Sequence, residues 1–429
     1  MDIKNQMFDL MSELYPICRS ITGNGVRKTL DIIKSHIDIQ IKEIPSGTQV
    51  FDWSIPKEWN INDAYVIDPN GEKIIDFKKS NLHVVSYSIP INKKISFEEL
   101  KAHLHTNPDQ PNVIPYVTSY YKEDWGFCIS HNQLNDLKYG EYQVCIDSSL
   151  ENGYLTYGEC FIPGQQSDEV IVSCYICHPS LCNDNLSGVI LTTFLAELLA
   201  EQKPRYSYRF LFIPETIGAI AWLSINEKNL IKIKHGLVAT CLGDSGKFTY
   251  KKSRQGNAEI DQIVSHVLKH SESDYDVLDF YPIGSDERQF CSPAFNLPIG
   301  SLMRTPYHRF PEYHTSGDNL EFVKKENLDE SLNKYRDIIF IIENNKNYVS
   351  LNPKCEPELG KRGLYTFSGI KRTEKKQDAD LQQESLLWVL NLSDGMNSLL
   401  DIANRSNLDF KLIKNAADRL RTCNLIQEK

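Results

Sequence analysis

The sequence contains no apolar run long enough to cross a membrane. Nowhere among its 429 residues do apolar side chains approach the ~18 consecutive positions that a membrane helix needs. The first residues, Met1–Leu14, mix charged and apolar side chains and do not form the basic start and apolar centre of a secretion signal. We therefore expect a cytoplasmic protein with no membrane partner.

Basic charge is also in short supply. The chain has 47 Lys and Arg against 57 Asp and Glu, a formal net charge of -10. This charge argues against nucleic-acid binding by the whole molecule, because a protein that neutralises phosphates needs a basic surface. No internal repeat is evident, and Gly243–Phe248 lacks the spacing and the final hydroxyl of a phosphate-binding loop.

The cysteines do not form a disulfide framework. There are 11, an odd number scattered from Cys18 to Cys423, which is typical of reduced thiols. Cys174 and Cys177 belong to a C-x-x-C-H stretch, the signature of c-type haem attachment, and Cys182 lies near enough to suggest a thiolate zinc site. Haem attachment would require export, and two cysteines three apart on a strand point to opposite faces. Buried apolar thiols are the interpretation that we favour over these two alternatives.

The most informative stretch runs from a strand pattern into a helix pattern. Val170–Ile176 is short, apolar and β-branched, as in a strand that is buried on both faces of a parallel sheet. His178 follows it, Asp184 lies in the polar loop, and a helix pattern spans Val189–Ala200. Ligands of open α/β sheets bind at such strand ends. Taken alone, the histidine could be a hydrogen-bonded loop residue and the aspartate a helix cap.

Three further polar clusters occur later in the sequence. Two of them follow predicted strands, and the third lies near the end of the core segment. The strand Tyr208–Ile213 leads to Glu215, and the strand His235–Leu242 leads to Asp244. A Y-H-T-S-G-D stretch occupies residues 313–318. Because the carboxyl ends of parallel strands meet at one edge of a sheet, these clusters are expected to lie together.

Read in order, these motifs resemble a known family. The pattern H-x(5)-D-N-x-S-G, E-x-x-G, a strand that ends in Asp, and Y-H-T-x-x-D resembles the zinc-dependent exopeptidases of the bacterial leucyl aminopeptidase and glutamate carboxypeptidase II type. Gly284–Phe290 and the later Asn296–Pro298 look like that family's S-D-x-x-x-F-x(n)-P element, and the motifs span about Gly153 to Asn345. A closer resemblance, over nearly the whole chain, is to bacterial proteins with an aminopeptidase-like domain and a C-terminal winged helix, some linked to polysaccharide biosynthesis.

The resemblance implies a zinc centre and a general base. Zinc accepts nitrogen and oxygen ligands and leaves a position for water. The implied ligands, with the second of them bridging two ions, are His178, Asp184, Asp244 and His314. Glu215 is the implied base, and Asp318 the implied partner that orients His314.

One departure from the family pattern concerns the number of ions. The resembled peptidases carry a second acidic residue directly after the base, and here that position is Thr216. A neutral hydroxyl is a poor zinc ligand. We therefore expect one firmly held zinc ion and a second that is weak or absent.

The same resemblance suggests residues that contact a substrate. They share a loop position near the expected cleft and a side chain able to hydrogen-bond a carboxylate: Arg254, Arg288, Arg304 and Tyr307. Arg288 is the favoured one because it lies inside the S-D-x-x-x-F element. The alternative is that these side chains form surface salt bridges.

The alternation of strand and helix patterns predicts the architecture. We expect an α/β protein with a mostly parallel sheet flanked by helices, formed by residues 1–61 and 151–350. Residues 62–150 read as a β-rich inserted domain, either a spacer or a lid that selects substrates. Residues 351–429 comprise a linker, Asn352–Gln377, and a tail that resembles a winged helix.

The composition of the tail bears on its role. Lys375–Lys429 holds eight basic and eight acidic residues, so the tail does not present the positive surface that DNA needs. Packing or assembly into a homo-oligomer is the interpretation that we favour.

Three functions remain open at this stage. The first is a metal-dependent exopeptidase-like hydrolase that cleaves an amide bond of a short peptide. The second is an amidohydrolase acting on an amino-acyl or amino-sugar compound, and the third is a non-catalytic binding or regulatory protein with a winged-helix tail. Glu215 favours catalysis, because a binding site has no need of a spare carboxylate beside the metal.

Overall fold

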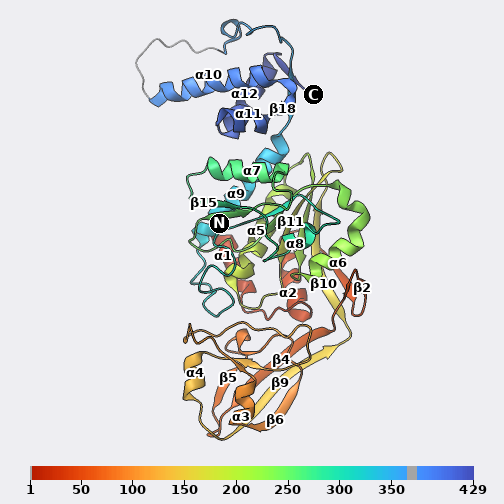
Figure 1. Cartoon of the computed structure of the whole chain (residues 1–429), viewed down its shortest axis with the longest axis vertical. Helices are drawn as coiled ribbons and strands as arrows, with labels where there is room; N and C mark the ends of the chain where they lie inside the picture. The colour runs from red at the N-terminus through yellow and green to blue at the C-terminus, as the bar shows by residue number, and fades with distance from the viewer. Residues whose placement is uncertain (1, 365–373) are drawn as a thin grey trace. The chain divides into compact units, whose positions relative to one another are not determined.

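The computed structural model describes residues 2–364 and 374–429. These residues divide into two compact units, one formed by residues 1–261 and 273–333 and the other by residues 262–272 and 334–429. Figure 1 shows the elements in chain order. The predicted linker Asn352–Gln377 lies partly outside the described residues, which omit 365–373.

The larger unit contains an eight-stranded sheet. Its four central strands, β12, β11, β13 and β16, run parallel, whereas β1 and β10 on one side and β14 on the other pair antiparallel with their inner neighbours. In spatial order the strands are β1 (Gln40–Pro45), β10 (Tyr154–Ile162), β12 (Ser207–Ile213), β11 (Glu169–Tyr175), β13 (Ile233–Ala239), β16 (Ile299–Met303), β14 (Phe248–Lys251) and β15 (Tyr275–Leu278). This agrees with the predicted α/β class.

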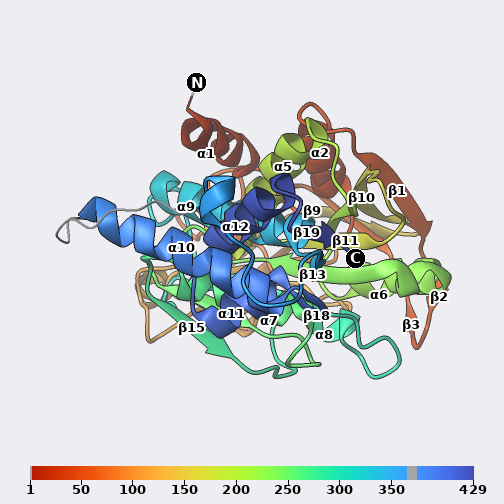
Figure 2. The ribbon, with the colours of Figure 1, turned by 90° about the horizontal axis from the view of Figure 1, so that it is seen from above.

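Helices cover both faces of this sheet. Helix α5 packs across β10, β11, β12 and β13, and α6 packs against α8. In Figure 2, α1, α2 and α5 lie on one side of the central strands and α6 and α8 on the other. The helices of the core sequence are α1 (Ile3–Leu14), α2 (Asn24–Ile33), α5 (Ser187–Ala200), α6 (Ile217–Asn226), α7 (Glu259–Lys269), α8 (Glu287–Phe290) and α9 (Lys325–Asn344). Helices α5 and α6 are almost entirely apolar because they are buried against the sheet.

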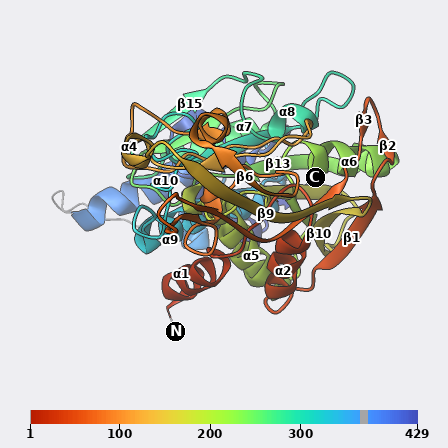
Figure 3. The same cartoon turned by 90° about the horizontal axis from the view of Figure 1, so that it is seen from below.

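The inserted region is β-rich, as the sequence predicts. Its antiparallel sheet has the order β5-β4-β9-β6 and an apolar core of its own. Strands β4, β5, β9 and β6 are labelled in Figure 1, and β9 and β6 can also be followed in Figure 3. Its elements are β4 (Glu58–Ile67), β5 (Lys73–Asp76), β6 (Ile91–Ser96), α3 (Phe97–Ala102), β7 (Leu104–His105), β8 (Phe127–Cys128), α4 (His131–Asp136) and β9 (Glu141–Glu151). The domain limits placed after residues 61 and 150 therefore fall inside β4 and β9. A small hairpin, β2 (Gln49–Val50) and β3 (Trp53–Ser54), precedes the insert.

The C-terminal unit contains a winged-helix arrangement of three helices and a three-stranded sheet. These elements are β17 (Asn347–Ser350), α10 (Glu374–Leu392), β18 (Asp394–Ser398), α11 (Leu399–Ser406), α12 (Phe410–Thr422) and β19 (Ile426–Glu428). The sheet order is β18-β17-β19. The sequence predicted the three helices and one short strand; the other two strands were missed because β17 pairs with residues far away in the chain. Within the described part of the chain, no helix has both the length and the apolarity required to span a lipid bilayer.

The start of α5 explains the N-x-S-G part of the sequence motif. The Asn185 amide donates to the Ala239 carbonyl at the end of β13 over 2.9 Å, and the Gly188 N–H donates back to Asn185 Oδ1 over 3.0 Å. A Cβ atom on Gly188 would lie 2.2 Å from the Ala239 carbonyl oxygen. Only glycine therefore allows α5 to begin this close to β13.

We expect Gly188→Ala to destabilise the protein by about 3 kcal/mol, because the added methyl group collides with backbone that has nowhere to move. Urea denaturation followed by circular dichroism would measure this. Gly360→Ala is the matched control, since, apart from Gly360 and its two chain neighbours, no atom of the described residues lies within 4 Å of the methyl group that it adds. Equal stability of the two variants would contradict the steric argument.

Candidate metal centre and catalytic site

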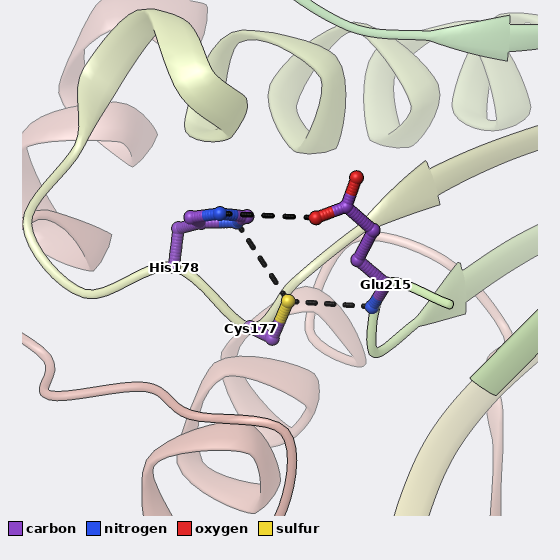
Figure 4. A group of neighbouring side chains, drawn as sticks. All are labelled: Cys177, His178 and Glu215. Carbon is purple, nitrogen blue, oxygen red and sulfur yellow. Dashed lines mark hydrogen bonds and ion pairs between the residues drawn. The ribbon is translucent and has the colours of Figure 1, made fainter. Parts of the chain in front are cut away.

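His178 and Glu215 reach the same edge of the sheet from adjacent strands. His178 follows β11 and Glu215 follows β12, and these strands are parallel neighbours, so their carboxyl ends coincide. His178 Nε2 lies 3.9 Å from Glu215 Oε2, as Figure 4 shows. The Glu215 N–H also donates to Cys177 Sγ over 3.3 Å, which fixes the turn after β12 against the turn after β11.

Asp184 and His314 complete a group of three metal-ligating side chains. Asp184 Oδ2 lies 3.0 Å from His314 Nε2 and 4.0 Å from His178 Nε2. One nitrogen or oxygen atom from each of the three residues lies within 4.8 Å of the others. Although Asp184 Oδ2 and His314 Nε2 are close and buried, neither makes a hydrogen bond of acceptable geometry.

The electrostatics of this group suit a cation. Burial lowers the pKa of His178 to about 4, so its imidazole is neutral and has a free lone pair. Burial alone would raise the pKa of Asp184, but the two histidines outweigh it and the pKa falls to about 2. Imidazole nitrogens and carboxylate oxygens are the donors that zinc accepts. The orphaned buried oxygen and nitrogen therefore fit a bound divalent cation.

Tyr175 and Asp318 hold Asp184 in place. The Tyr175 hydroxyl donates a short hydrogen bond to Asp184 Oδ1 and lies 2.6 Å from Thr240 Oγ1. The Asp318 carboxylate accepts from the backbone N–H groups of Asn183, over 2.6 Å, and Asp184, over 2.9 Å. We predicted that Asp318 orients His314. The structure corrects this, because both of its oxygens bind the loop that carries Asp184.

Asp244, predicted as a ligand, lies outside the group. Its carboxylate accepts hydrogen bonds from the Asn183 side chain, the Gly246 N–H, and both the N–H and the hydroxyl of Thr305. Strand β13 ends at Ala239, five residues before Asp244, so Asp244 does not lie at the strand end itself. Through these four hydrogen bonds the Asp244 carboxylate joins three loops. It does not belong to any of the metal-ligating groups found in residues 2–364 and 374–429.

Thr216 lies beside Glu215 but is bound to other residues. Its φ of 64° places it in the left-handed region, which a β-branched residue rarely adopts. Two contacts from the Ser285–Phe290 element hold it there. Its N–H donates to Asp286 Oδ1 over 2.7 Å, and its hydroxyl accepts from Arg288 Nη2 over 3.2 Å. Strained backbone of this kind concentrates at functional sites.

The four predicted substrate-binding residues separate into two groups. Arg288 approaches Glu215 through its contact with Thr216, and its Nε has no hydrogen-bond partner. The Arg304 guanidinium instead binds the Gly246 carbonyl and Glu330. The other two also have partners elsewhere: Tyr307 binds the buried ion pair of Lys251 and Glu287, and Arg254 donates to Asn296 at the surface.

Sequence reasoning missed three residues that shape the centre. Tyr175 was counted only as part of a buried strand, yet it binds Asp184. Arg19, buried near the N-terminus, donates from Nε to the His178 carbonyl over 2.9 Å. The Tyr116 ring, from the inserted domain, packs against both His178 and His314. No local signal could reveal Arg19 or Tyr116, because each lies far from its partners along the chain.

Neither cysteine alternative brings two cysteines together in the described residues, although Cys177 belongs to a second metal-ligating group, with His178 and Glu215. Cys174 Sγ donates to the Leu211 carbonyl inside the sheet, and no two cysteines occur together in a metal-ligating group there. Cys177 lies beside His178 with its Sγ 3.7 Å from Nδ1, as in Figure 4, and burial holds the pKa of its thiol well above the usual value. These cysteines are buried apolar side chains, as favoured above.

Comparison with known proteins extends this description. Residues 8–345 match the family described as "Domain of unknown function (DUF4910)", and residues 346–428 match a winged helix-turn-helix family. The first match takes in more than half of the chain. The chain belongs to the DUF4910 family.

This DUF4910 protein has relatives with an aminopeptidase-like domain. It is 56% identical over 422 residues, 98% of this chain and 96% of the relative, to a Clostridium acetobutylicum protein named as a candidate polysaccharide biosynthesis protein with an aminopeptidase-like domain. The crystal structure of a candidate peptidase from the same organism superposes with a TM-score of 0.94 at 54% identity, covering 99% and 96% of the two chains.

More distant structures share the fold of the DUF4910 protein. A zinc aminopeptidase from Bacillus subtilis has a TM-score of 0.57 at 13% identity, covering 79% of this chain and 94% of that one. The similarity of fold to zinc aminopeptidases and the C-terminal winged helix, both expected from the sequence, are confirmed.

The buried Asp286 carboxyl predicts a pH dependence of stability. Burial raises the pKa of Asp286 to about 7, against about 4 in an unfolded chain. The folded state therefore keeps its proton longer, and this contribution to stability is lost as the pH rises from about 4 to about 7. We expect Asp286→Asn to reduce the fall in melting temperature of the metal-free protein over this range. Asp279→Asn, at a side chain 91% exposed, is the control, and identical pH profiles for all three proteins would contradict the assignment.

Proposed function

We propose that the protein is a metal-dependent hydrolase that cleaves an amide bond in a peptide or a small amide substrate. The observation that supports this most strongly is the convergence of His178, Asp184 and His314 around a buried oxygen and nitrogen without hydrogen-bond partners, with Glu215 directly beside them. An aminopeptidase-like fold adds support.

The three converging residues would hold a zinc ion. Zinc in such a site lowers the pKa of a water molecule and polarises a carbonyl group. Tyr175 and Asp318 keep the Asp184 carboxylate aimed at the two imidazoles, through its Oδ1 and its backbone N–H. Rigid support of this kind raises metal affinity.

Glu215 is suited to act as the general base. Its side chain is 28% exposed, so water and substrate can reach it. Burial, followed by the charges of Asp286 and Asp184, holds its pKa well above the usual value, which brings the carboxylate closer to the operating pH of a proton acceptor. Glu215 would take a proton from the attacking water at its carboxylate and return it to the leaving amine.

We infer one firmly bound ion and not two. The hydroxyl at position 216 accepts a hydrogen bond from Arg288, and the Asp244 carboxylate is held by four donors, so neither completes a second ligand set. Arg288 keeps an unpaired Nε next to this space. We assign it to a carboxylate of the substrate, since a guanidinium binds a carboxylate through two parallel hydrogen bonds.

A second candidate is an amidohydrolase of an amino-sugar or amino-acyl compound. It uses the same residues and differs only in the substrate. The observation that favours it is the name of the Clostridium acetobutylicum relative, which mentions polysaccharide biosynthesis. Release of amine from short peptides, compared with release from N-acylated amino sugars, distinguishes the two.

We expect one tightly bound zinc ion per chain after repletion, because the two groups of metal-ligating side chains, His178–Asp184–His314 and Cys177–His178–Glu215, share His178, and the raised pKa of the Cys177 thiol disfavours the second group. His314→Gln should lose this ion, whereas His308→Gln, at an exposed histidine, should retain it. Elemental analysis of dialysed protein measures the stoichiometry. No bound divalent metal in the replete wild type, or equal content in the two variants, would exclude the proposed centre.

We expect Glu215→Gln to bind zinc normally and to lower turnover at least ~100-fold, as loss of a general base should. The measurement is amine release from a panel of peptides and acylated amino sugars. Glu227→Gln, which changes an exposed glutamate, should leave turnover unaltered. Full activity in Glu215→Gln would remove the proposed mechanism.

A further inference from the structure

One segment of the inserted domain contacts the loop that carries His314. We call residues 114–120 the strap. The Tyr116 N–H donates to the His314 carbonyl over 2.7 Å, and Pro115 forms an antiparallel bridge with Thr315. Ile114 and Ser316 exchange two further hydrogen bonds of 3.0 and 2.8 Å. The strap is therefore bound, mainly through its backbone, to the candidate ligand His314 and to the two residues that follow it.

The Tyr116 ring lies against both candidate histidine ligands. Its centroid is 5.3 Å from that of His178 and 5.2 Å from that of His314, and both contacts are edge-on, at 62° and 80°. The two imidazole centroids are themselves 5.3 Å apart. Tyr116 is only 8% exposed, so its ring is packed and not free to turn away. One side chain of the insert thus limits how both imidazoles can rotate.

A chain of aromatic contacts fixes the Tyr116 ring in turn. Its hydroxyl is 2.6 Å from the Tyr120 hydroxyl, and the Tyr120 ring packs edge-on against Tyr87 at 5.4 Å. Tyr87 stacks on Trp59 of β4 at 5.8 Å, and its hydroxyl is 2.5 Å from Thr22 Oγ1 in the N-terminal segment. The ring is therefore anchored to the insert and to the core.

The conformation of His314 explains why it needs this support. Its φ of 53° lies in the left-handed region, where a residue with a Cβ atom remains only if its surroundings hold it. The strap binds its carbonyl, Tyr313 stacks on one face of its imidazole at 4.0 Å, and Tyr116 lies edge-on to the ring. Without the strap, this backbone and the imidazole would be free to relax.

We propose that the inserted domain is a working part of the metal centre, in which Tyr116 is a positioning residue that sets the imidazoles of His178 and His314. This rests on the proposed function, which assigns those two histidines as ligands. The insert is then neither a spacer nor only a cover over the cleft. Its removal or displacement would loosen two of the three ligands together.

The test uses three variants and one control in the full-length protein. Tyr116→Leu removes the ring between the imidazoles. Tyr116→Phe and Tyr120→Phe each remove one of the two hydroxyl groups, and so the hydrogen bond that anchors the Tyr116 ring. Both variants keep the aromatic packing and serve as a matched pair. Tyr139→Leu makes the same change as the first variant at a tyrosine of the insert that is 81% exposed.

Two properties are measured. Competition with a chelator gives the zinc dissociation constant, and NMR relaxation of 13C-labelled histidines in the metal-free protein gives the mobility of each imidazole. We expect Tyr116→Leu to weaken zinc binding about 10- to 100-fold, the range typical of residues that support a metal ligand, and to mobilise both imidazoles. The two Phe variants should each weaken it about fivefold, as loss of one hydrogen bond does, and Tyr139→Leu should match wild type.

The outcomes separate the two proposals. Unchanged zinc affinity together with rigid imidazoles in all three variants would overturn the positioning role of Tyr116. This holds even if the melting temperature falls, because a purely structural residue lowers stability without loosening the ligands. If Tyr116→Leu does not fold, the Phe pair decides on the same criteria. If wild type binds no zinc but the variants mobilise both imidazoles, Tyr116 keeps its role and the metal assignment fails.

Discussion

The buried carboxylate of Asp184 is the constraint around which the core is arranged. It is 1% exposed, and a charge so deep in a protein costs several kcal/mol unless opposite charge or hydrogen bonds compensate it. Tyr175 satisfies Oδ1, while Oδ2 faces two imidazoles and has no hydrogen bond. A divalent cation at this point would compensate the charge. The surrounding loops are held in positions that leave Asp184 Oδ2 available to bind such a cation.

The polar loops around Asp184 are joined to one another by hydrogen bonds. Asn183 joins the carboxylate of Asp244 to the Gly243 N–H, and Asn185 joins β13 to the start of α5. Ser187 accepts from the Leu242 N–H in the same way. Buried polar groups are usually paired, and the side chains of Asn183, Asn185 and Ser187 each have defined partners. The result is a rigid frame in which the ligand geometry does not depend on a bound substrate.

Two segments remote in sequence complete the frame. Arg19 holds the carbonyl of His178, and burial lowers the pKa of its guanidinium to about 10, so it stays positively charged at neutral pH. The inserted domain contributes the strap and Tyr116. The core sheet places the candidate ligands near one another, and these two segments restrict how their side chains can turn.

Periodicity and local motifs by themselves predicted most of the elements, the α/β class and the edge of the sheet at which the candidate site lies. His178, Asp184, Glu215 and His314 could be named through the resemblance to zinc-dependent exopeptidases, because the motifs that carry it have local spacing. Tertiary structure alone decided the rest. Asp244 and Asp318 were assigned to the wrong partners because a carboxylate in a loop can turn toward a metal or toward backbone N–H groups, and only packing selects between them. Tyr116 could not be found, because its contact with His314 spans almost two hundred residues and depends on how the insert folds back onto the core.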